Sequence, residues 1–361
     1  MRTEIATLAG KTFANRPLAI AVAMLLALEG LLAVLGMIAP TEPLLRGWLV
    51  AFAIWSTVPV GSMTLLMIHR LTGGAWGWAA APVLRPAAAM TPLVALGFVP
   101  ILISLPHIYP WAADPSAIPA DVARWYLNGP SFLIRSLIAL GGWSLLAIVF
   151  ATGRGSRLLA GLGLAFFGLT ISLVAVDWYL SLEPHYVAST FAAMIAIQQL
   201  LAALAITALI GAPTIEGKVA GDLGAFLIAT LLGVVYLELM TFVVAWYGDL
   251  PEKAAWFLKR GGPGWIAVLL AALSVGAALP FGMLLIKAIR CSRRGLRVAG
   301  GLILVGIILH TIWLLAPAFT LQAGIIVVAC AGVAGLAGLS IFIGSALGAV
   351  LGAPLEVRHA E

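Results

Sequence analysis

The chain has 361 residues, of which 63% are hydrophobic and 9% are charged, and its mean hydropathy is +1.12. Because soluble domains contain about 25% charged residues, this composition predicts an all-α polytopic membrane protein and gives no indication of a soluble domain. The net charge of +6 does not indicate nucleic-acid binding, because the basic residues are scattered between apolar runs and are typical of membrane-topology signals. The two cysteines, Cys291 and Cys330, form no CxxC pair, which excludes a cysteine-ligated iron–sulfur cluster or a c-type haem on this chain alone.

Ten apolar runs are long enough to cross the hydrocarbon core, which requires about 20 residues. The first, 18–38, contains Glu29 and is followed by no convincing cleavage site, so we interpret it as a retained helix and not as a signal peptide. The others lie near 47–68, 87–106, 131–150, 158–180, 187–211, 222–247, 264–287, 296–317 and 322–350. Turn-forming segments such as "LTGGAWG", "ATGRGSR" and "RGGPG" separate them. We therefore expect one integral membrane domain, 1–361, with about ten transmembrane helices.

The basic residues predict the orientation of these helices. An even number of spans places both termini on one side. Of the 20 Lys and Arg residues, Arg135 lies inside a span, fourteen lie on the side of the termini, and five lie on the opposite side: Arg46, Arg124, Lys253, Lys259 and Arg260. The positive-inside rule therefore places both termini in the cytoplasm and the segment "SLEPH" in the periplasm.

Two segments suggest an internal repeat. "ARWYLNGPSFL" is similar to "AAWFLKRGGPGWI", with Trp125 and Trp256 131 residues apart. Four predicted spans separate them, so both copies have the same orientation. Either the chain is a parallel repeat with halves 47–180 and 187–317, each a four-helix bundle, or two unrelated loops both use interfacial tryptophan.

Ionisable side chains inside the apolar runs are candidate functional residues, because such groups are costly in a bilayer and usually face a bundle interior or a cavity. One interpretation is a path for protons or quinol, in which the acids exchange protons with a ligand or with water. The alternative is structural: Arg135 neutralises Asp177, and the other groups bond across helices, as we also expect for Gln198 and Gln199. The candidates are Glu29, Arg135, Asp177, Glu238 and His310.

The segment "VDWYLSLEPHYVAST", 176–190, places further polar groups where one apolar run ends. Pro184 cannot extend a helix, so Asp177 is expected about one turn inside the membrane, with Glu183 and His185 at its surface. This placement suits a proton handover between bilayer and water, since histidine titrates near neutral pH. The alternative is an interfacial anchor built from the aromatic residues of the segment. Only His310 is clearly inside a span, which argues against a haem with two histidine ligands, so the chain is not expected to carry electrons unaided.

The same segment resembles the "DW…SLEPHW…ST" signature of the NrfD-like membrane subunits of alternative complex III, a bacterial quinol:electron-acceptor oxidoreductase. Other segments are similar to its ActF-type subunit and occur in the same order along the chain: "HRLTGGAWG", "LPHIYPWA", "WYLNGPSFLIRS" and "WYGDLPEKAAWFLKR". The chain looks like a divergent member, because its signature lacks the Trp after the His and His310 stands where an acidic residue is expected. The resemblance implies a ten-helix subunit of the bacterial inner membrane, made from two four-helix bundles plus extra helices.

The resemblance also implies partners and site residues. The partners are a paralogous NrfD-like subunit, an iron–sulfur subunit, multihaem and monohaem cytochrome c subunits, and membrane lipid, so that haem and iron–sulfur centres lie only in the partners. We expect a quinone such as menaquinone to contact Asp177, His185 and Arg135. We expect protons to move along a path that includes Glu29, Asp177, Glu183, Glu238 and His310. The alternatives are a structural anchor for redox subunits and a secondary transporter.

Overall fold

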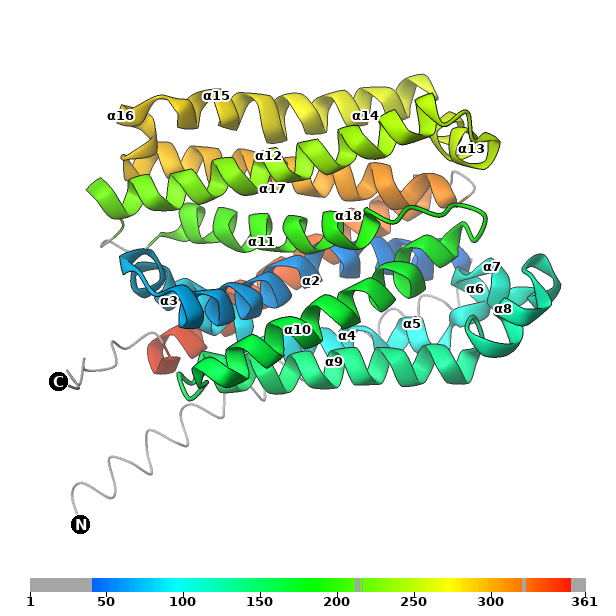
Figure 1. Ribbon diagram of the computed structural model, residues 1–361, viewed down its shortest axis with the longest axis horizontal. Coiled ribbons are helices and arrows are strands. Elements are labelled where there is room, and N and C mark those ends of the chain that lie inside the picture. Colours follow the sequence, from blue (N-terminus) through cyan, green and yellow to red (C-terminus); the bar gives the residue numbers. More distant parts are fainter. Residues whose placement is uncertain (1–40, 212–214, 216, 320–322, 352–361) are drawn as a thin grey trace, which may run out of the picture.

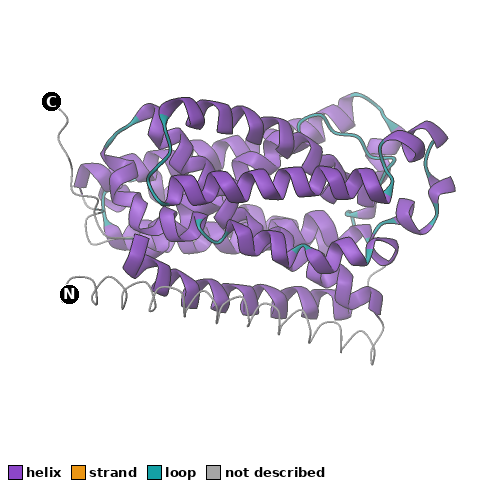
Figure 2. Ribbon diagram, turned by 90° about the horizontal axis from the view of Figure 1, so that it is seen from below, coloured by secondary structure: helices purple, strands orange, loops and turns teal. Residues whose placement is uncertain are grey.

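The computed structural model describes residues 41–211, 215, 217–319 and 323–351, and within these ranges the chain forms helices and no strand (Figure 1). Figure 2 shows the same helices joined by short loops. The first predicted span, 18–38, and its Glu29 lie outside the described residues.

Eight helices of the described part are long and apolar enough to cross a membrane, so the chain is a polytopic membrane protein by helix length and composition. Four of the eight are single α-helices: α2 (Thr41–Thr72), α9 (Gly129–Ala151), α11 (Phe191–Ile210) and α12 (Gly217–Tyr247). The other four are composite and cover Ala75–Ile103, Arg157–Leu182, Pro263–Leu285 and Arg293–Ala318. A further apolar helix, α18 (Ala323–Leu351), follows them. The prediction of an all-helical polytopic membrane protein is thus confirmed.

Two of the composite spans contain π-helical turns. The first consists of α10 (Arg157–Val174), the π-helical turn η2 (Ala175–Tyr179) and the 3₁₀ turn η3 (Leu180–Leu182). The second consists of α14 (Pro263–Leu273), the π-helical turn η4 (Ser274–Ala278) and α15 (Leu279–Leu285). The last composite span is simpler, with α17 (Arg293–Leu315) ending in the 3₁₀ turn η5 (Ala316–Ala318).

Prolines divide the remaining composite span, which consists of α3 (Ala75–Ala88), α4 (Thr91–Gly97) and α5 (Val99–Ile103). Pro92 and Pro100 each lie in the first turn of a new helix, because proline lacks the N–H that would continue the previous one. The span begins at Ala75, well before the predicted start at 87. Its first part reads as a loop in the sequence because it contains two prolines and an arginine, yet α3 includes all three.

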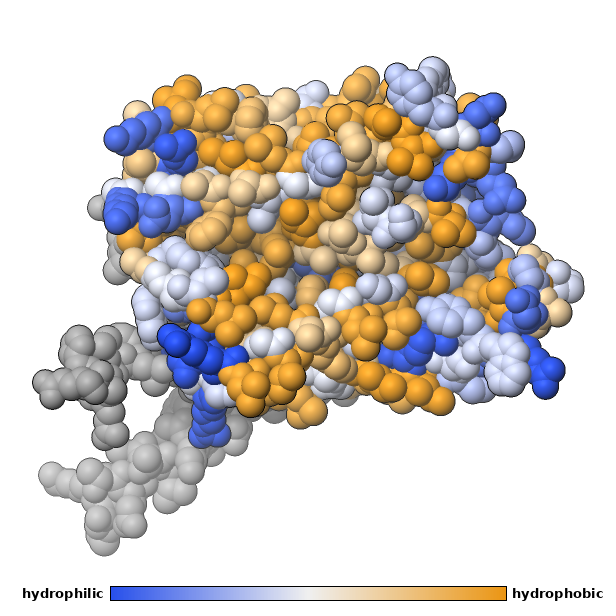
Figure 3. Space-filling model, viewed as in Figure 1, coloured by the Kyte–Doolittle hydropathy of each residue, from blue (hydrophilic) through white to orange (hydrophobic). Residues whose placement is uncertain are grey.

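The helices lie side by side along the long axis of the molecule, with α2 at the centre and in contact with α3, α9, α10, α11, α17 and α18. The side chains of α2, including Trp48, Phe52 and Met63, are almost entirely buried. By contrast, α9, α12 and α14 expose large apolar side chains such as Leu145, Leu239 and Leu270. Hydrophilic residues gather mainly at the two ends of the molecule and apolar residues cover the length between them (Figure 3). This distribution is the one a bilayer requires.

Small residues allow close helix contacts in the second half of the chain. A Cβ atom on Gly276 would collide with the backbone of Gly306, and a Cβ atom on Gly306 would collide with that of Gly276. Gly276 lies in η4 and Gly306 in α17, so these two elements cross backbone to backbone. Small residues have this role in membrane bundles, where association depends on close van der Waals packing.

The short helices gather at the two ends of the long ones. One end carries α6 (Leu105–Ile108), α7 (Pro110–Ala113), α8 (Ala120–Trp125) and α13 (Pro251–Lys259), all on the right in Figure 1. The opposite end carries the turn between α2 and α3 and the four-residue helix α16 (Lys287–Arg290). The loop that contains Glu183 and His185 lies at the first end, because Glu183 contacts Lys259 of α13.

Candidate functional site

Arg135 and Asp177 form a two-pronged ion pair between α9 and η2. The Arg135 Nε atom donates to Asp177 Oδ2 at 2.6 Å and Nη2 donates to Oδ1 at 2.9 Å. Nη2 also donates to the backbone carbonyl of Tyr126 at 2.9 Å, and the guanidinium lies 3.9 Å from the centre of the Tyr126 ring. The Asp177 side chain is only 2% exposed. Both oxygens of this buried carboxylate are therefore neutralised, as the structural alternative predicts.

The π-helical turn that carries Asp177 is fixed by its neighbours. The Trp178 indole N–H donates to Ser136 Oγ at 3.1 Å, and the Tyr109 hydroxyl donates to the Trp178 carbonyl at 3.2 Å. A π-helical turn leaves some carbonyls without their usual helical partner. The Tyr109 hydroxyl supplies one such carbonyl with a hydrogen bond, and this ties the α6–α7 region to the ion pair.

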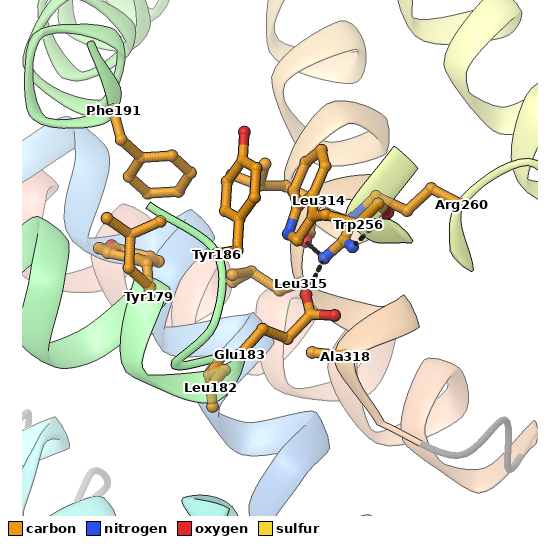
Figure 4. Close-up of a pocket in the computed structure, with 11 residues that line it drawn as sticks. Tyr179, Leu182, Glu183, Tyr186, Phe191, Trp256, Arg260, Leu314, Leu315 and Ala318 are labelled. Atoms are coloured by element: carbon orange, nitrogen blue, oxygen red, sulfur yellow. Dashed lines mark hydrogen bonds and ion pairs between the residues drawn. The ribbon is translucent and has the colours of Figure 1, made fainter. Parts of the chain in front are cut away.

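A second ionic cluster joins the loop after η3 to α13. The carboxylate of Glu183 accepts from Arg260 Nη2 at 2.5 Å (Figure 4) and from Lys259 Nζ at 3.1 Å. Arg260 also donates to the carbonyls of Leu314 at 2.8 Å and Trp256 at 3.1 Å. Only 1% of the Arg260 side chain is exposed. Burial lowers the pKa of Arg260, and the neighbouring Glu183 acts in the opposite direction.

Aromatic side chains cover this second cluster. The Arg260 guanidinium lies 3.6 Å from the centre of the Trp256 ring, and Tyr186 stacks on Trp256 at 4.4 Å between ring centres. The cavity beside them has a volume of about 10 Å³, which is room for about one water molecule. Burial raises the pKa of the Tyr186 hydroxyl well above its usual value, and the nearby charge of Glu238 adds to this effect.

Glu238 and His310 form a third contact, between α12 and α17. Glu238 Oε1 and His310 Nε2 are 2.7 Å apart, but the angle is not that of an aligned hydrogen bond. Neither ring nitrogen of His310, which is 8% exposed, has an aligned partner among the described residues. The Trp313 ring lies 5.9 Å from His310 and 5.8 Å from Trp256. Aromatic rings thus connect the third contact with the second cluster.

The remaining predicted residues take separate positions. His185 is exposed and makes none of the contacts of the three clusters. Gln198 donates to Thr311 Oγ1 at 3.1 Å, which is the expected bond between helices. Gln199 is also buried, but its Oε1 atom has no hydrogen-bond partner in the described part of the chain. Glu29 lies outside the described residues.

The sequence analysis did not identify Arg260 or Tyr126 as part of a site. Arg260 follows the amphipathic segment "AAWFLK" and was interpreted only as a loop cation that reports topology. The signal that could have indicated its role is the Trp256–Arg260 spacing, which places the cation one helical turn from an aromatic face. Tyr126 acts through its backbone carbonyl and ring face, and no sequence pattern identifies such a contact.

Fold and ionic contacts together define a polytopic helical membrane protein with acidic and basic side chains paired between its helices. Within the described ranges, no group of three or more His, Cys, Asp or Glu side chains is arranged to hold a metal ion. No protein-family model matches the chain, and no curated protein is significantly similar to it.

Proposed function

We propose that the chain is an integral membrane subunit of a bacterial quinol:electron-acceptor oxidoreductase of the alternative complex III type, similar to its NrfD-like ActF subunit. In this proposal it has ten transmembrane helices and lies in the inner membrane with both termini in the cytoplasm. It contributes groups that move protons and holds no redox centre. The haem and iron–sulfur centres belong to cytochrome c and iron–sulfur partner subunits, and a paralogous NrfD-like subunit lies beside it.

The observation that carries the proposal is the contact between Glu238 and His310. A carboxylate oxygen and an imidazole nitrogen 2.7 Å apart are close enough to exchange a proton once the two side chains align. Because both side chains are largely shielded from solvent, a purely structural pair would be expected to form an aligned hydrogen bond, which this contact lacks. Tyr186 lies within the electrostatic influence of both Glu238 and Glu183, and Glu183 lies at the end of the molecule that carries α13. We propose that protons move along this series of side chains.

At these ionic contacts the geometry supports a proton route better than a quinone site. Both Asp177 oxygens accept from Arg135, so a quinol hydroxyl would have to displace the arginine. The cavity beside Glu183, about 10 Å³, is far smaller than a quinone ring. A quinone such as menaquinone that contacts this chain would therefore bind near the exposed His185 and the end of the Arg135–Asp177 pair, not inside the second cluster. In this proposal the proton path includes Glu29, Asp177, Glu183, Glu238 and His310.

Helix contacts support two four-helix bundles. One group consists of α2, the α3–α5 span, α9 and α10, and the other of α11, α12, the α14–α15 span and α17. In each group a short helix, α8 or α13, precedes a long helix that begins at a Gly–Pro pair, Gly129–Pro130 or Gly262–Pro263. This correspondence supports the predicted repeat of 47–180 and 187–317, with α18 packed on the first group.

The experiment that tests the proposal is purification of the native membrane complex followed by substitution of its acids. We expect cytochrome c and iron–sulfur subunits to co-purify with the chain. We expect Glu238→Gln to reduce quinol-driven proton release at least tenfold while the complex remains assembled. Glu252→Gln, which changes an exposed acid at the start of α13, is the matched control and should leave proton release unchanged.

Two other outcomes would contradict the proposal. If Glu238→Gln and Asp177→Asn both leave quinol turnover and proton release unchanged in the assembled complex, the chain is a structural anchor. If the chain is purified without redox partners and moves a solute across vesicles on its own, it is a transporter.

A further inference from the structure

A pocket lined by cationic side chains lies at the end of the molecule where α2 ends and α3 begins. Its volume is about 230 Å³, and it opens between the α2–α3 turn and the α9–α10 turn. The lining includes His69, Arg70, Arg85 and Arg157, and it includes no Asp or Glu side chain. The pocket lies far from the three ionic contacts described above, at the opposite end of the long helices.

The positive charge of this pocket is uncompensated within the described part of the chain. No carboxylate there lies within 4 Å of Arg70, Arg85 or Arg157. Arg85 is half-buried inside α3, where an unpaired guanidinium is costly. Arg157 is the first residue of α10, so the positive end of that helix dipole adds to the same field. Like charges held together in this way favour an anionic ligand.

The wall around His69 is fixed in position. His69 Nε2 donates to the Gly74 carbonyl at 3.0 Å, and its ring lies edge-on to Trp76 at 5.2 Å and to Trp78 at 5.4 Å. A Cβ atom on Gly77 would collide with the same ring. Because a carbonyl can only accept, Nε2 carries the proton of this bond. The ring thus has a single orientation beside the arginines.

The rim of the pocket is apolar and lies where the helices end. Trp78 is 58% exposed and Leu158 is 74% exposed. Large apolar side chains continue from there along the outer face of α10 as Leu162 and Leu169. Exposed tryptophan is typical of the boundary between hydrocarbon and headgroups. A ligand here would meet cations at its head and an apolar helix face along its tail.

We propose that this pocket binds the phosphate group of an anionic lipid, with the acyl chains lying along α10. Arginine suits phosphate because its planar fork donates two hydrogen bonds at once. Basic pockets at the ends of membrane helices bind such headgroups by the same chemistry. The inference is independent of the proposed redox function, since it uses only the pocket and the charges that line it.

The test is lipid binding by the purified full-length chain, measured by native mass spectrometry and by thermal unfolding in nanodiscs. The probes are phosphatidylglycerol, phosphatidylcholine with the same acyl chains, and inorganic phosphate alone. We expect wild-type protein to retain phosphatidylglycerol at least tenfold more tightly than phosphatidylcholine. Arg85→Gln and Arg157→Gln should each reduce this preference to less than threefold.

Arg154→Gln is the matched control, because Arg154 lies in the same α9–α10 turn but does not line the pocket. It should keep the wild-type preference. Equal retention of the two lipids by wild-type protein would overturn the proposal even if the arginine variants failed to fold. Equal loss of the preference in Arg154→Gln would also overturn it, since the effect would then reflect general surface charge. If inorganic phosphate alone stabilised the protein as much as phosphatidylglycerol does, the pocket would be a site for free phosphate, and the proposal of a lipid ligand would be overturned.

Discussion

Arginine compensates the buried carboxylate of Asp177 and the partly buried carboxylate of Glu183, and the two pairs differ in which partner is buried. Asp177 receives both of its hydrogen bonds from Arg135, which keeps 14% of its side chain exposed. Glu183 is bound by Arg260, whose side chain is 1% exposed and therefore depends on this carboxylate for charge compensation. Removing one partner of a buried pair costs more than the pair contributes, because an uncompensated charge stays behind. The Glu183–Arg260 pair is thus the more sensitive of the two.

Glu183→Gln should destabilise the protein by about 3–5 kcal/mol, because it leaves the Arg260 cation buried without a counter-charge. Glu42→Gln is the control, since Glu42, whose side chain is 52% exposed, pairs with Arg46 and ion pairs of exposed carboxylates contribute about 1 kcal/mol or less. Thermal unfolding in detergent measures both. In the double variant Glu183→Gln/Arg260→Met, much of the lost stability should return. Equal losses in Glu183→Gln and Glu42→Gln would show that Arg260 is hydrated and the pair unimportant.

Tyr126 should make the stability of the folded protein depend on pH under alkaline conditions. Burial raises its pKa to about 12, and the negative charge of Asp177 adds to this. The folded state therefore holds the phenolic proton more tightly than the unfolded chain, whose tyrosine pKa is about 10. Its contribution to stability is fully present below about pH 10 and is lost as the pH rises toward 12. The measurement is the phenolate absorbance of the wild type minus that of Tyr126→Phe as a function of pH. A midpoint of this difference near pH 10 would contradict the prediction.

At the scale of the element, long helices follow from apolar run length, but their internal breaks do not. Hydrophobic length placed five of the predicted spans within the eight observed candidate spans, and three more, 87–106, 187–211 and 264–287, overlap the observed ones but extend past their ends. The π-helical turns η2 and η4 were not predicted, because an added residue per turn leaves no trace in a uniformly apolar stretch. The early start of α3 was missed for the opposite reason, since its prolines and Arg85 look like a loop.

An ionic contact was predictable only where both of its residues stand out in the sequence as ionisable groups inside apolar runs. An ion pair between Asp177 and Arg135 was one of the two alternatives, because both residues lie in apolar runs, where an unpaired charge is costly. The pairing of Glu183 with Arg260 was not predicted, because the two residues are 77 positions apart. Glu183 was expected on a proton path, and Arg260 looks like an ordinary loop charge. Glu238 and His310 were named separately, but their contact depends on how α12 and α17 are rotated about their axes, which a uniformly apolar helix does not specify.

The close crossing of η4 and α17 predicts that a larger residue at Gly276 destabilises the protein. Gly276→Ala should destabilise the protein by about 1–3 kcal/mol, because its new methyl group meets the Gly306 backbone, which cannot rotate away. Gly282→Ala is the matched control, since no atom lies within 4 Å of the Cβ position at Gly282 of the adjoining α15. In that helix alanine should be neutral or stabilising. Thermal unfolding of the two variants measures the difference, and an unchanged midpoint in Gly276→Ala would mean that the helices do not cross so closely.

At the scale of the whole molecule, the distribution of charge over the two ends bears on the proposed orientation in the membrane. The charged residues gather mainly at the two ends of the apolar body (Figure 3). One end carries His185 and α13, and the other carries Arg70, Arg157 and the basic segment that begins α17. Most of the described Lys and Arg residues lie at the second end, which in the proposed topology faces the cytoplasm by the positive-inside rule. The proposed lipid site and the proposed proton exit would then lie on opposite faces of the membrane.

Cysteine labelling in whole cells tests this orientation. In a background of Cys291→Ser and Cys330→Ser, His185→Cys should react with a membrane-impermeant maleimide added to cells with a permeable outer envelope, because His185 is exposed at the end that carries α13. Arg294→Cys, in the first turn of α17 at the opposite end, should react only after the inner membrane is opened. Three of the eight candidate spans lie between these two positions, so reversal of both results would invert the whole molecule and place the proton exit in the cytoplasm. Labelling of both positions in intact cells would show that one of the eight spans does not cross the membrane.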